Sequence, residues 1–308
     1  MKLNRRRLNL VQLLMNNSIL HRVQGFLDQV SKKGVDLDPV LLEEFKQSCE
    51  NSIVRQFASK KEKWRPRMSS LGRPLCQQKM ERDGKEKTVE YNSIIRFIFG
   101  DLVEAIAILI LKSAGVNVED EQKKVDLKLG DNEISGTLDL IVDGKVWDIK
   151  SASPYAFEHK FGDMGGYKKI KEDDAFGYIA QGFLYSESVD KEFGGWIVIN
   201  KASGEWVVCE APTIQDVDRK EALVLAKNNL KALVNGEKFK RCFSDTAETY
   251  KDENKKEKKT GNRLLPSICG FCDFKKTCWP DIIMHRKVTS KAKFPRAVWY
   301  SKLVKREL

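Results

Sequence analysis

The chain has 308 residues, of which 41% are hydrophobic and 9% aromatic, so it can bury a proper core and is not a disordered polyelectrolyte. Its 55 Lys and Arg exceed its 44 Asp and Glu, and the formal net charge of +11 favours a polyanionic partner such as nucleic acid. No apolar run approaches the roughly 20 residues of a membrane span, and the N-terminal stretch lacks a clean signal-peptide pattern, so we expect a cytoplasmic protein.

Residues 1–62 are predicted to form a helical N-terminal extension. Asp38-Pro39 is a good helix start, because it offers a capping carboxylate and a proline at the first helical position. Apolar residues then recur every four positions from Leu41 to Phe57, which predicts an amphipathic helix. The remainder, residues 63–308, is assigned to one larger domain.

That larger domain opens with a long helix predicted over about residues 93–113. The sequence SIIRFIFGDLVEAIAILILKS is apolar nearly all round, so the helix should be buried, and Gly115 should end it. Strand-like segments follow up to Lys150, and a loop-rich, glycine-containing stretch covers residues 154–174.

The second half of the chain alternates between helical and strand patterns. A helix is predicted near residues 175–188, followed by two strands, GWIVIN and EWVVCE, and by a long helix over about 213–234. Residues 244–262 are highly charged and poor in apolar groups, which predicts a mobile surface loop. This order of elements predicts an α/β fold with a mixed central sheet and helices on both sides.

The most informative segment, EISGTLDLIVDGKVWDIKS, covers residues 133–151. Two alternating runs flank Asp143-Gly144, which is the strongest short signal for a β-hairpin. With these two residues as the loop, Leu140 faces Trp147 on an apolar face of the hairpin. The polar residues of both runs then share the opposite face.

On that polar face, Asp139 stands directly opposite Asp148. Like charges at such a position destabilise a hairpin unless a cation lies between them, and carboxylate oxygens suit Mg²⁺ or Mn²⁺. Lys150, on the same face, could orient an attacking water or neutralise charge developing on a phosphate. The alternative is a solvated hairpin face with incidental charges.

Two helices carry further candidates. Glu104 lies in the middle of the helix predicted to be buried, so it needs a cation or a proton, and a metal shared with the two aspartates would supply the charge. A lysine-paired glutamate is the alternative. Gln181 and Tyr185 stand four residues apart and therefore share one face of the next helix.

Together these residues resemble a known family. Gly100-x-x-x-Glu104, Gly136-x-x-Asp139, Asp148-Ile149-Lys150 and Gln181-x-x-x-Tyr185 look, in this order and spacing, like the RecB-type branch of the PD-(D/E)XK nucleases, over roughly residues 69–280. The resemblance implies that the acids bind the metal, that the carbonyl of Ile149 completes its shell, and that Lys150 assists the nucleophilic water. It also implies that the helix of Gln181 and Tyr185 contacts DNA. Many relatives carry histidine where this chain has Glu104.

The seven cysteines indicate a second metal site. An odd number in a long chain without an export signal argues against a disulfide scaffold, and Cys269-Gly-Phe-Cys272 followed by Cys278 is a cluster of the kind that holds metal. With Cys76 upstream, the pattern resembles CRISPR-associated RecB-like exonucleases and phage-encoded relatives, in which four thiolates bind a [4Fe–4S] cluster. Zinc is the chemical alternative. Cys209 and Cys242 are expected to be structural.

The resemblance implies a metal-dependent DNA nuclease from a bacterial, archaeal or phage-infected cell. Exonuclease action on DNA ends or single strands is the expected activity. Two alternatives stay open: a structure-specific or spacer-processing endonuclease in a larger complex, and a DNA-binding adaptor that does not cleave. The complete set of two acids and a lysine counts against the adaptor.

Overall fold

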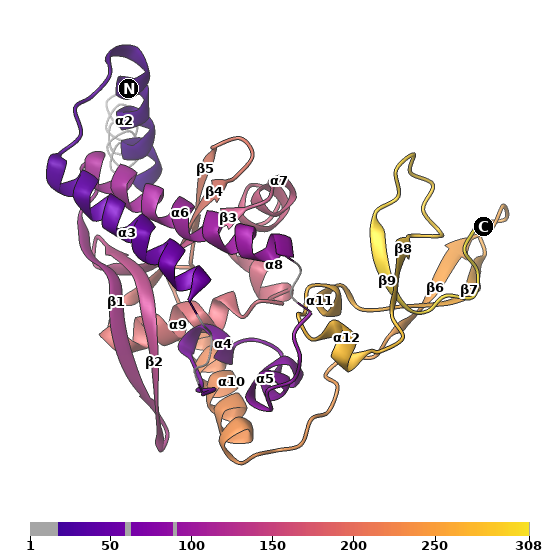
Figure 1. Cartoon of the computed structure of the whole chain (residues 1–308). Helices are drawn as coiled ribbons and strands as arrows, with labels where there is room; N and C mark the ends of the chain where they lie inside the picture. Colours follow the sequence, from indigo (N-terminus) through magenta and orange to yellow (C-terminus); the bar gives the residue numbers. More distant parts are fainter. Residues whose placement is uncertain (1–17, 59–62, 89–90, 308) are drawn as a thin grey trace, which may run out of the picture. The chain divides into compact units, whose positions relative to one another are not determined.

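The computed structural model describes residues 18–58, 63–88 and 91–307 (Figure 1). They form two compact units: a core unit from residues 1–72 and 91–228, and a cysteine unit from residues 73–90 and 229–308. The boundary between the units differs from the predicted one at residues 62 and 63. The N-terminal helices belong to the core unit, and the clustered cysteines lie in the other.

The core unit is built on a mixed five-stranded sheet. Its strands lie in the order β1 (Val118–Leu129), β2 (Asn132–Val142), β3 (Lys145–Ala152), β4 (Glu192–Asn200) and β5 (Trp206–Glu210). All neighbours are antiparallel except β3 and β4, which are parallel. A parallel pair needs a long crossover connection, which residues 153–191 provide here. The predicted mixed sheet is therefore confirmed.

Helices cover both faces of this sheet, as predicted. On one face, α2 (Ile19–Lys33) and α6 (Tyr91–Ser113) pack against apolar side chains of β2 to β5. On the other, α9 (Tyr178–Val189) and α10 (Asp216–Val234) pack against β4, whose residues are buried from Phe193 onward. Burial on both sides explains why β4 is an almost continuous apolar run.

The crossover contains more helix than the sequence indicated. The stretch predicted to be loop-rich holds α7 (Pro154–Ala156), a single π-helical turn η1 (Phe157–Phe161) and α8 (Tyr167–Glu172). Phe161 and Ile170 from these short segments are buried in the same apolar cluster as α9. The crossover is thus anchored to the sheet.

Long helix α6 is only partly buried. Ala105, Ala107, Ile108 and Leu111 in its second half are buried, whereas in its first half Ile95 is 48% and Phe99 55% exposed. The prediction that the helix is buried throughout is wrong for its first half, because only the second half packs against the sheet. Composition alone does not say how much of an apolar helix the sheet beneath it covers.

Helix α3 (Pro39–Phe57) begins where the sequence predicted. The Asp38 side chain accepts a hydrogen bond from the Val40 amide at 2.8 Å, which is the expected capping contact. Helix α3 packs against α6. Helices predicted for residues 1–17 and 59–62 lie outside the described residues. No helix in the described part of the chain is both long and apolar enough to span a membrane.

The cysteine unit combines short helices with a second sheet. Helices α5 (Leu75–Arg82), α11 (Ser267–Gly270) and α12 (Lys275–Cys278), with the turn between the last two, carry the clustered cysteines. The antiparallel sheet has the order β6 (Thr246–Lys251), β7 (Glu257–Leu264), β9 (Ala297–Lys302) and β8 (Ile283–Arg286).

Strands β6 and β7 correct the prediction of a mobile loop over residues 244–262. Glu248 is 1% exposed and accepts hydrogen bonds from Asn262 Nδ2 at 2.9 Å and from the Tyr300 hydroxyl at 2.8 Å. The sheet is therefore organised around a buried polar network. Such a network leaves no apolar pattern in the sequence, which is why the strands were not predicted.

Candidate functional site

The hairpin of β2 and β3 has the predicted register. Leu140 pairs with Trp147, Ile141 with Val146, and Val142 with Lys145, on either side of the Asp143-Gly144 turn. Both turn residues have positive φ, 47° and 75°, the conformation for which Asp-Gly is favoured in tight hairpins. Leu140, Trp147 and Ile149 belong to the apolar cluster beneath α6.

The ladder between the two strands ends just before the two aspartates. The last paired residues are Leu140 and Trp147. Beyond them, the Ile149 amide donates its hydrogen bond to Asp139 Oδ2 at 2.8 Å, so a side-chain carboxylate takes the place of a backbone carbonyl of β2. This contact places Asp139 beside the backbone of the residue that follows Asp148. The two predicted acids are thus brought together where the strands separate.

Asp148 is buried, with 4% of the residue exposed. Its Oδ2 forms an ion pair with Lys150 Nζ at 2.5 Å, and its Oδ1 accepts a hydrogen bond from Gln181 Nε2 at 2.9 Å. Gln181 reaches it from α9, and Lys150 from two positions along β3. Three predicted residues from two elements therefore meet at one carboxylate.

Glu104 extends from the half of α6 that packs on the sheet, and its carboxylate accepts a hydrogen bond from Gln122 of β1. The residue is half-buried, less enclosed than the sequence predicted. Burial raises the pKa of Glu104 to about 7, and the negative charges of Asp148 and Asp101 contribute to this rise. The positive charge of Lys150 acts in the opposite direction. The glutamate is therefore an electrostatic neighbour of the aspartate site.

The remaining titratable groups show the same imbalance of charge. Burial raises the pKa of Asp139 well above its usual value, and the charges of Glu104 and Asp148 raise it further. Burial would lower the pKa of Lys150, but the carboxylates of Asp148 and Asp139 raise it above its usual range. Lys150 therefore keeps its proton, and three acids face a single lysine.

Tyr185 is 4% exposed and packs against the glycine of the Gly136-x-x-Asp139 motif. A Cβ atom on Gly136 would lie 2.6 Å from Tyr185 Cε1, so only glycine admits the ring. Burial raises the pKa of Tyr185, and the charges of Asp139 and Asp148 add to the effect. Gly100 is not constrained in this way, because its nearest neighbour, Ser151 Oγ, would lie at 3.8 Å.

The carboxylates at present bind neighbouring donors of the protein. Across the described residues, no three His, Cys, Asp or Glu side chains are gathered closely enough to hold a metal ion as they stand. Instead, each carboxylate contacts a donor of the protein: Asp148 pairs with Lys150, Glu104 accepts from Gln122, and Asp139 accepts from the Ile149 amide. The donor chemistry fits Mg²⁺ or Mn²⁺, because these ions prefer oxygen ligands and would relieve the mutual repulsion of the acids.

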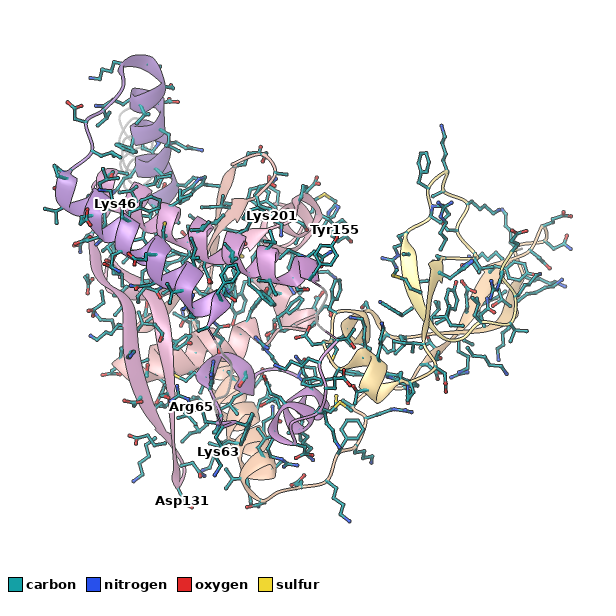
Figure 2. The ribbon with its side chains drawn as sticks, in the orientation of Figure 1. Lys46, Lys63, Arg65, Asp131, Tyr155 and Lys201 are labelled. Atoms are coloured by element: carbon teal, nitrogen blue, oxygen red, sulfur yellow. The ribbon has the colours of Figure 1, made fainter. Side chains whose placement is uncertain are left out.

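Sequence reasoning missed two groups beside this site. Gln122, which binds Glu104, lies on a charged strand with no motif to mark it. The second is Tyr178, whose ring centroid lies 5.2 Å from Lys150 Nζ and 5.1 Å from Lys160 Nζ. Tyr178 could have been found from the sequence, because it stands three residues before Gln181 on α9 and therefore shares a face with it. Tyr155, labelled in Figure 2, is 71% exposed on the same crossover.

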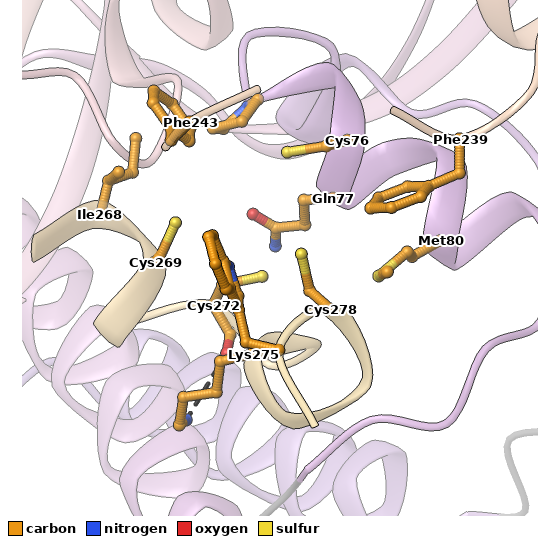
Figure 3. A pocket seen from close by; sticks show the side chains of 12 residues that line it. Cys76, Gln77, Met80, Phe239, Phe243, Ile268, Cys269, Cys272, Lys275 and Cys278 are labelled. Atoms are coloured by element: carbon orange, nitrogen blue, oxygen red, sulfur yellow. Dashed lines mark hydrogen bonds between the residues drawn. The ribbon is translucent and has the colours of Figure 1, made fainter. Parts of the chain in front are cut away.

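The four predicted cysteines of the cysteine unit line one small cavity. Cys76 comes from α5, Cys269 from α11, Cys272 from the following turn and Cys278 from α12. Figure 3 shows their sulfur atoms facing the space between these segments. Most of the other lining side chains are apolar, among them Met80, Phe239, Phe243 and Ile268, and Gln77 and Lys275 add two polar ones.

Cys242 also lies at this cluster, contrary to the expectation that it stands apart. The Cys76 amide donates a hydrogen bond to Cys242 Sγ at 3.1 Å. The hydrogen bond between the two thiols lowers the pKa of Cys242 to about 6 and raises that of Cys76. Cys242 was missed because nothing in its sequence spacing connects it to the other cysteines.

Comparisons with known proteins add little to this geometry. No model of a known protein family matches the chain, and no curated protein is similar to it in sequence. A solved structure named SSO0001 covers 78% of this chain and 96% of its own, with 15% identity and a TM-score of 0.39. Another, named "Putative exonuclease" from Eubacterium rectale, covers 68% of this chain and 91% of its own, with 15% identity and a TM-score of 0.37. Likenesses this distant carry no argument about function.

Proposed function

We propose that this protein is a metal-dependent DNA nuclease of the RecB-like PD-(D/E)XK type. The observation that carries the proposal is the meeting of Glu104, Asp139, Asp148 and Lys150, which come from three elements of the core unit. Burial raises the pKa values of Glu104 and Asp139, and the negative charge of the neighbouring carboxylates raises them further. A fold that gathers three acids around one lysine tolerates repulsion that a structural role would not require.

The three carboxylates are the proposed ligands of Mg²⁺ or Mn²⁺, with the carbonyl of Ile149 as a further oxygen donor. When bound, such an ion supplies positive charge that offsets both the acids and the scissile phosphate. Gln181 holds one oxygen of Asp148 through its amide, and the Ile149 amide holds one oxygen of Asp139. These two contacts fix the directions in which the remaining carboxylate oxygens point.

Lys150 is proposed to act as a hydrogen-bond donor. Because the neighbouring carboxylates raise its pKa, it stays protonated and cannot serve as a general base at neutral pH. Its ammonium group can orient a water molecule for in-line attack on phosphorus, or stabilise the negative charge that develops as the phosphorus–oxygen bond to the leaving group breaks. Gln181 and Tyr185 complete the proposed catalytic set, with Tyr185 packed beneath β2.

DNA is the proposed substrate, and action on ends or single strands the proposed mode. The net charge of +11 supports a polyanionic substrate. Lys150 and Lys160 both lie beside the ring of Tyr178 next to the acids, and their positive charge suits a phosphate group of the substrate.

The cysteine unit is proposed to hold a [4Fe–4S] cluster with a structural role. A single zinc ion needs thiolates about 3.8 Å apart, as follows from a zinc–sulfur bond of about 2.3 Å in a tetrahedron. Four thiols of the cysteine unit line one cavity, which suits either centre. The split spacing of one cysteine upstream and three downstream, which resembles that of the iron–sulfur nucleases, favours the cluster over zinc.

Digestion of matched DNA substrates tests the proposed activity. End-labelled linear DNA, circular single strands and closed circular duplex should be incubated with Mg²⁺ or Mn²⁺, and with EDTA as the metal-free control. We expect linear DNA to be degraded only with metal, and circular DNA to resist. Cleavage of the circles would replace the exonuclease by an endonuclease, and binding without any cleavage would leave the DNA-binding adaptor.

A further inference from the structure

Cys242 is held next to Cys76 by hydrogen bonds of its own sulfur and of the residues that precede it. Its sulfur accepts a hydrogen bond from the Cys76 amide at 3.1 Å. The segment that precedes it is fastened to α5, because Lys79 Nζ bonds Glu237 at 3.0 Å and the Lys238 carbonyl at 3.2 Å. Lys79 is itself only 5% exposed, so the attachment is an enclosed one.

The residue next to Cys242 is fastened to the opposite side of the cysteine cavity. Arg241 donates two hydrogen bonds to the Cys278 carbonyl, at 3.1 Å from Nε and 2.6 Å from Nη2. Its guanidinium also lies 3.9 Å from the ring centroid of Trp279. Residues 237–242 therefore connect the segment that carries Cys76 to the segment that carries Cys278, and Cys242 lies at the junction.

Cys242 is thus a fifth thiol that lies next to Cys76, one of the four cysteines that line the cavity. A soft metal centre is the usual reason for a protein to gather several thiols, and an exposed cysteine held against another one by charged anchors fits that purpose. We propose that Cys242 is a thiolate ligand of the metal cluster at the one corner that Cys76 can also occupy, because each of the four irons of a [4Fe–4S] cluster takes a single thiolate. The proposal rests on the metal centre proposed above and is independent of nuclease activity.

Metal analysis of serine variants tests this assignment. Wild-type protein, Cys76→Ser, Cys242→Ser and the double variant should be purified without oxygen, with Cys209→Ser as the control for a buried thiol outside the cluster. Iron and acid-labile sulfide per chain are then measured, together with the visible absorption and electron paramagnetic resonance spectra. We expect each single variant to keep part of the iron with altered spectra, and the double variant to lose most of it.

The proposal is overturned if Cys242→Ser changes neither the iron content nor the spectra, both in the wild type and in the Cys76→Ser background. A wild-type protein without any metal would overturn the metal centre and this assignment together, while leaving the carboxylate site untouched. Activity on DNA is not used as a readout, so failure of the nuclease proposal is recognised separately.

A second measurement needs no variant and so cannot be confused by misfolding. The native protein is treated with iodoacetamide before and after removal of the metal, and the modified cysteines are identified by mass spectrometry. Since Cys242 is exposed, a free thiol there should react readily in both states. We expect it to react only after the metal is removed. Equal reaction in both states would contradict ligation.

Discussion

Replacement of Glu104 by glutamine should stabilise the metal-free protein at alkaline pH. Burial and the neighbouring acids raise the pKa of Glu104 from 4.5 to about 7 in the folded state. Between these two values the unfolded chain releases the proton while the folded protein retains it, so the free energy of unfolding falls as pH rises. Above pH 7 the full loss is present, and below pH 4.5 it is absent. Glutamine keeps the hydrogen-bond acceptor toward Gln122 and cannot ionise.

The size of this effect follows from the same pKa. A rise from 4.5 to about 7 corresponds to at most about 3 kcal/mol, and partial solvation of the half-buried side chain reduces this to about 1–3 kcal/mol. For a unit of this size, that difference raises the melting temperature by roughly 2–12 °C. A bound cation should cancel the advantage, because it removes the repulsion that the substitution relieves.

Thermal unfolding in EDTA at pH 5 and pH 8 measures the effect directly. Glu133→Gln serves as the matched control, since Glu133 is an exposed glutamate on β2. We expect Glu104→Gln to melt above the wild type at pH 8, to lose most of that advantage at pH 5, and to gain less than the wild type from added Mn²⁺. A melting difference that is independent of pH would refute the electrostatic reasoning.

Three further results are expected. Gly136→Ala should lower the free energy of unfolding by about 1–3 kcal/mol, measured by thermal unfolding, because the new Cβ meets the Tyr185 ring. The control Gly100→Ala, at an open position of α6, should be neutral or stabilising, and equal losses in both variants would contradict the packing described. Asp139→Asn should reduce the melting-temperature gain produced by Mn²⁺, and an unchanged gain would remove Asp139 from the ligand set. DNA affinity should fall linearly with salt on logarithmic axes, with single strands competing better than duplex, and salt-independent binding would contradict the basic surface.

Much of the site could be predicted because it depends on local rules. Asp143-Gly144 fixes the hairpin turn, and alternation then fixes which side chains share a face, so Asp139 and Asp148 were brought together from the sequence alone. The end of the ladder at these residues could not be foreseen, since it depends on the Asp139 carboxylate taking the Ile149 amide. A side-chain acceptor of this kind leaves no periodic signal.

Features that depend on tertiary contacts were less predictable. The first half of α6 is also rich in large apolar residues, yet it is more exposed than the second half, because only the second half packs against the sheet. Strands β6 and β7 are held around Glu248, a residue that reads as one more charge in a polar stretch. Cys242 reaches Cys76 across 166 positions of sequence through the contacts of Arg241 and Lys79, which no spacing rule anticipates.

Cleavage by the Asp148→Asn protein tests the central claim most directly. Asparagine keeps the size of the side chain and an oxygen for Gln181 but removes the charge that pairs with Lys150. With Mn²⁺ and end-labelled linear DNA, we expect the wild type and the exposed control Asp126→Asn to degrade the substrate, and Asp148→Asn to bind it without cleavage. Robust cleavage by Asp148→Asn would contradict the assignment of this carboxylate cluster as the nuclease site.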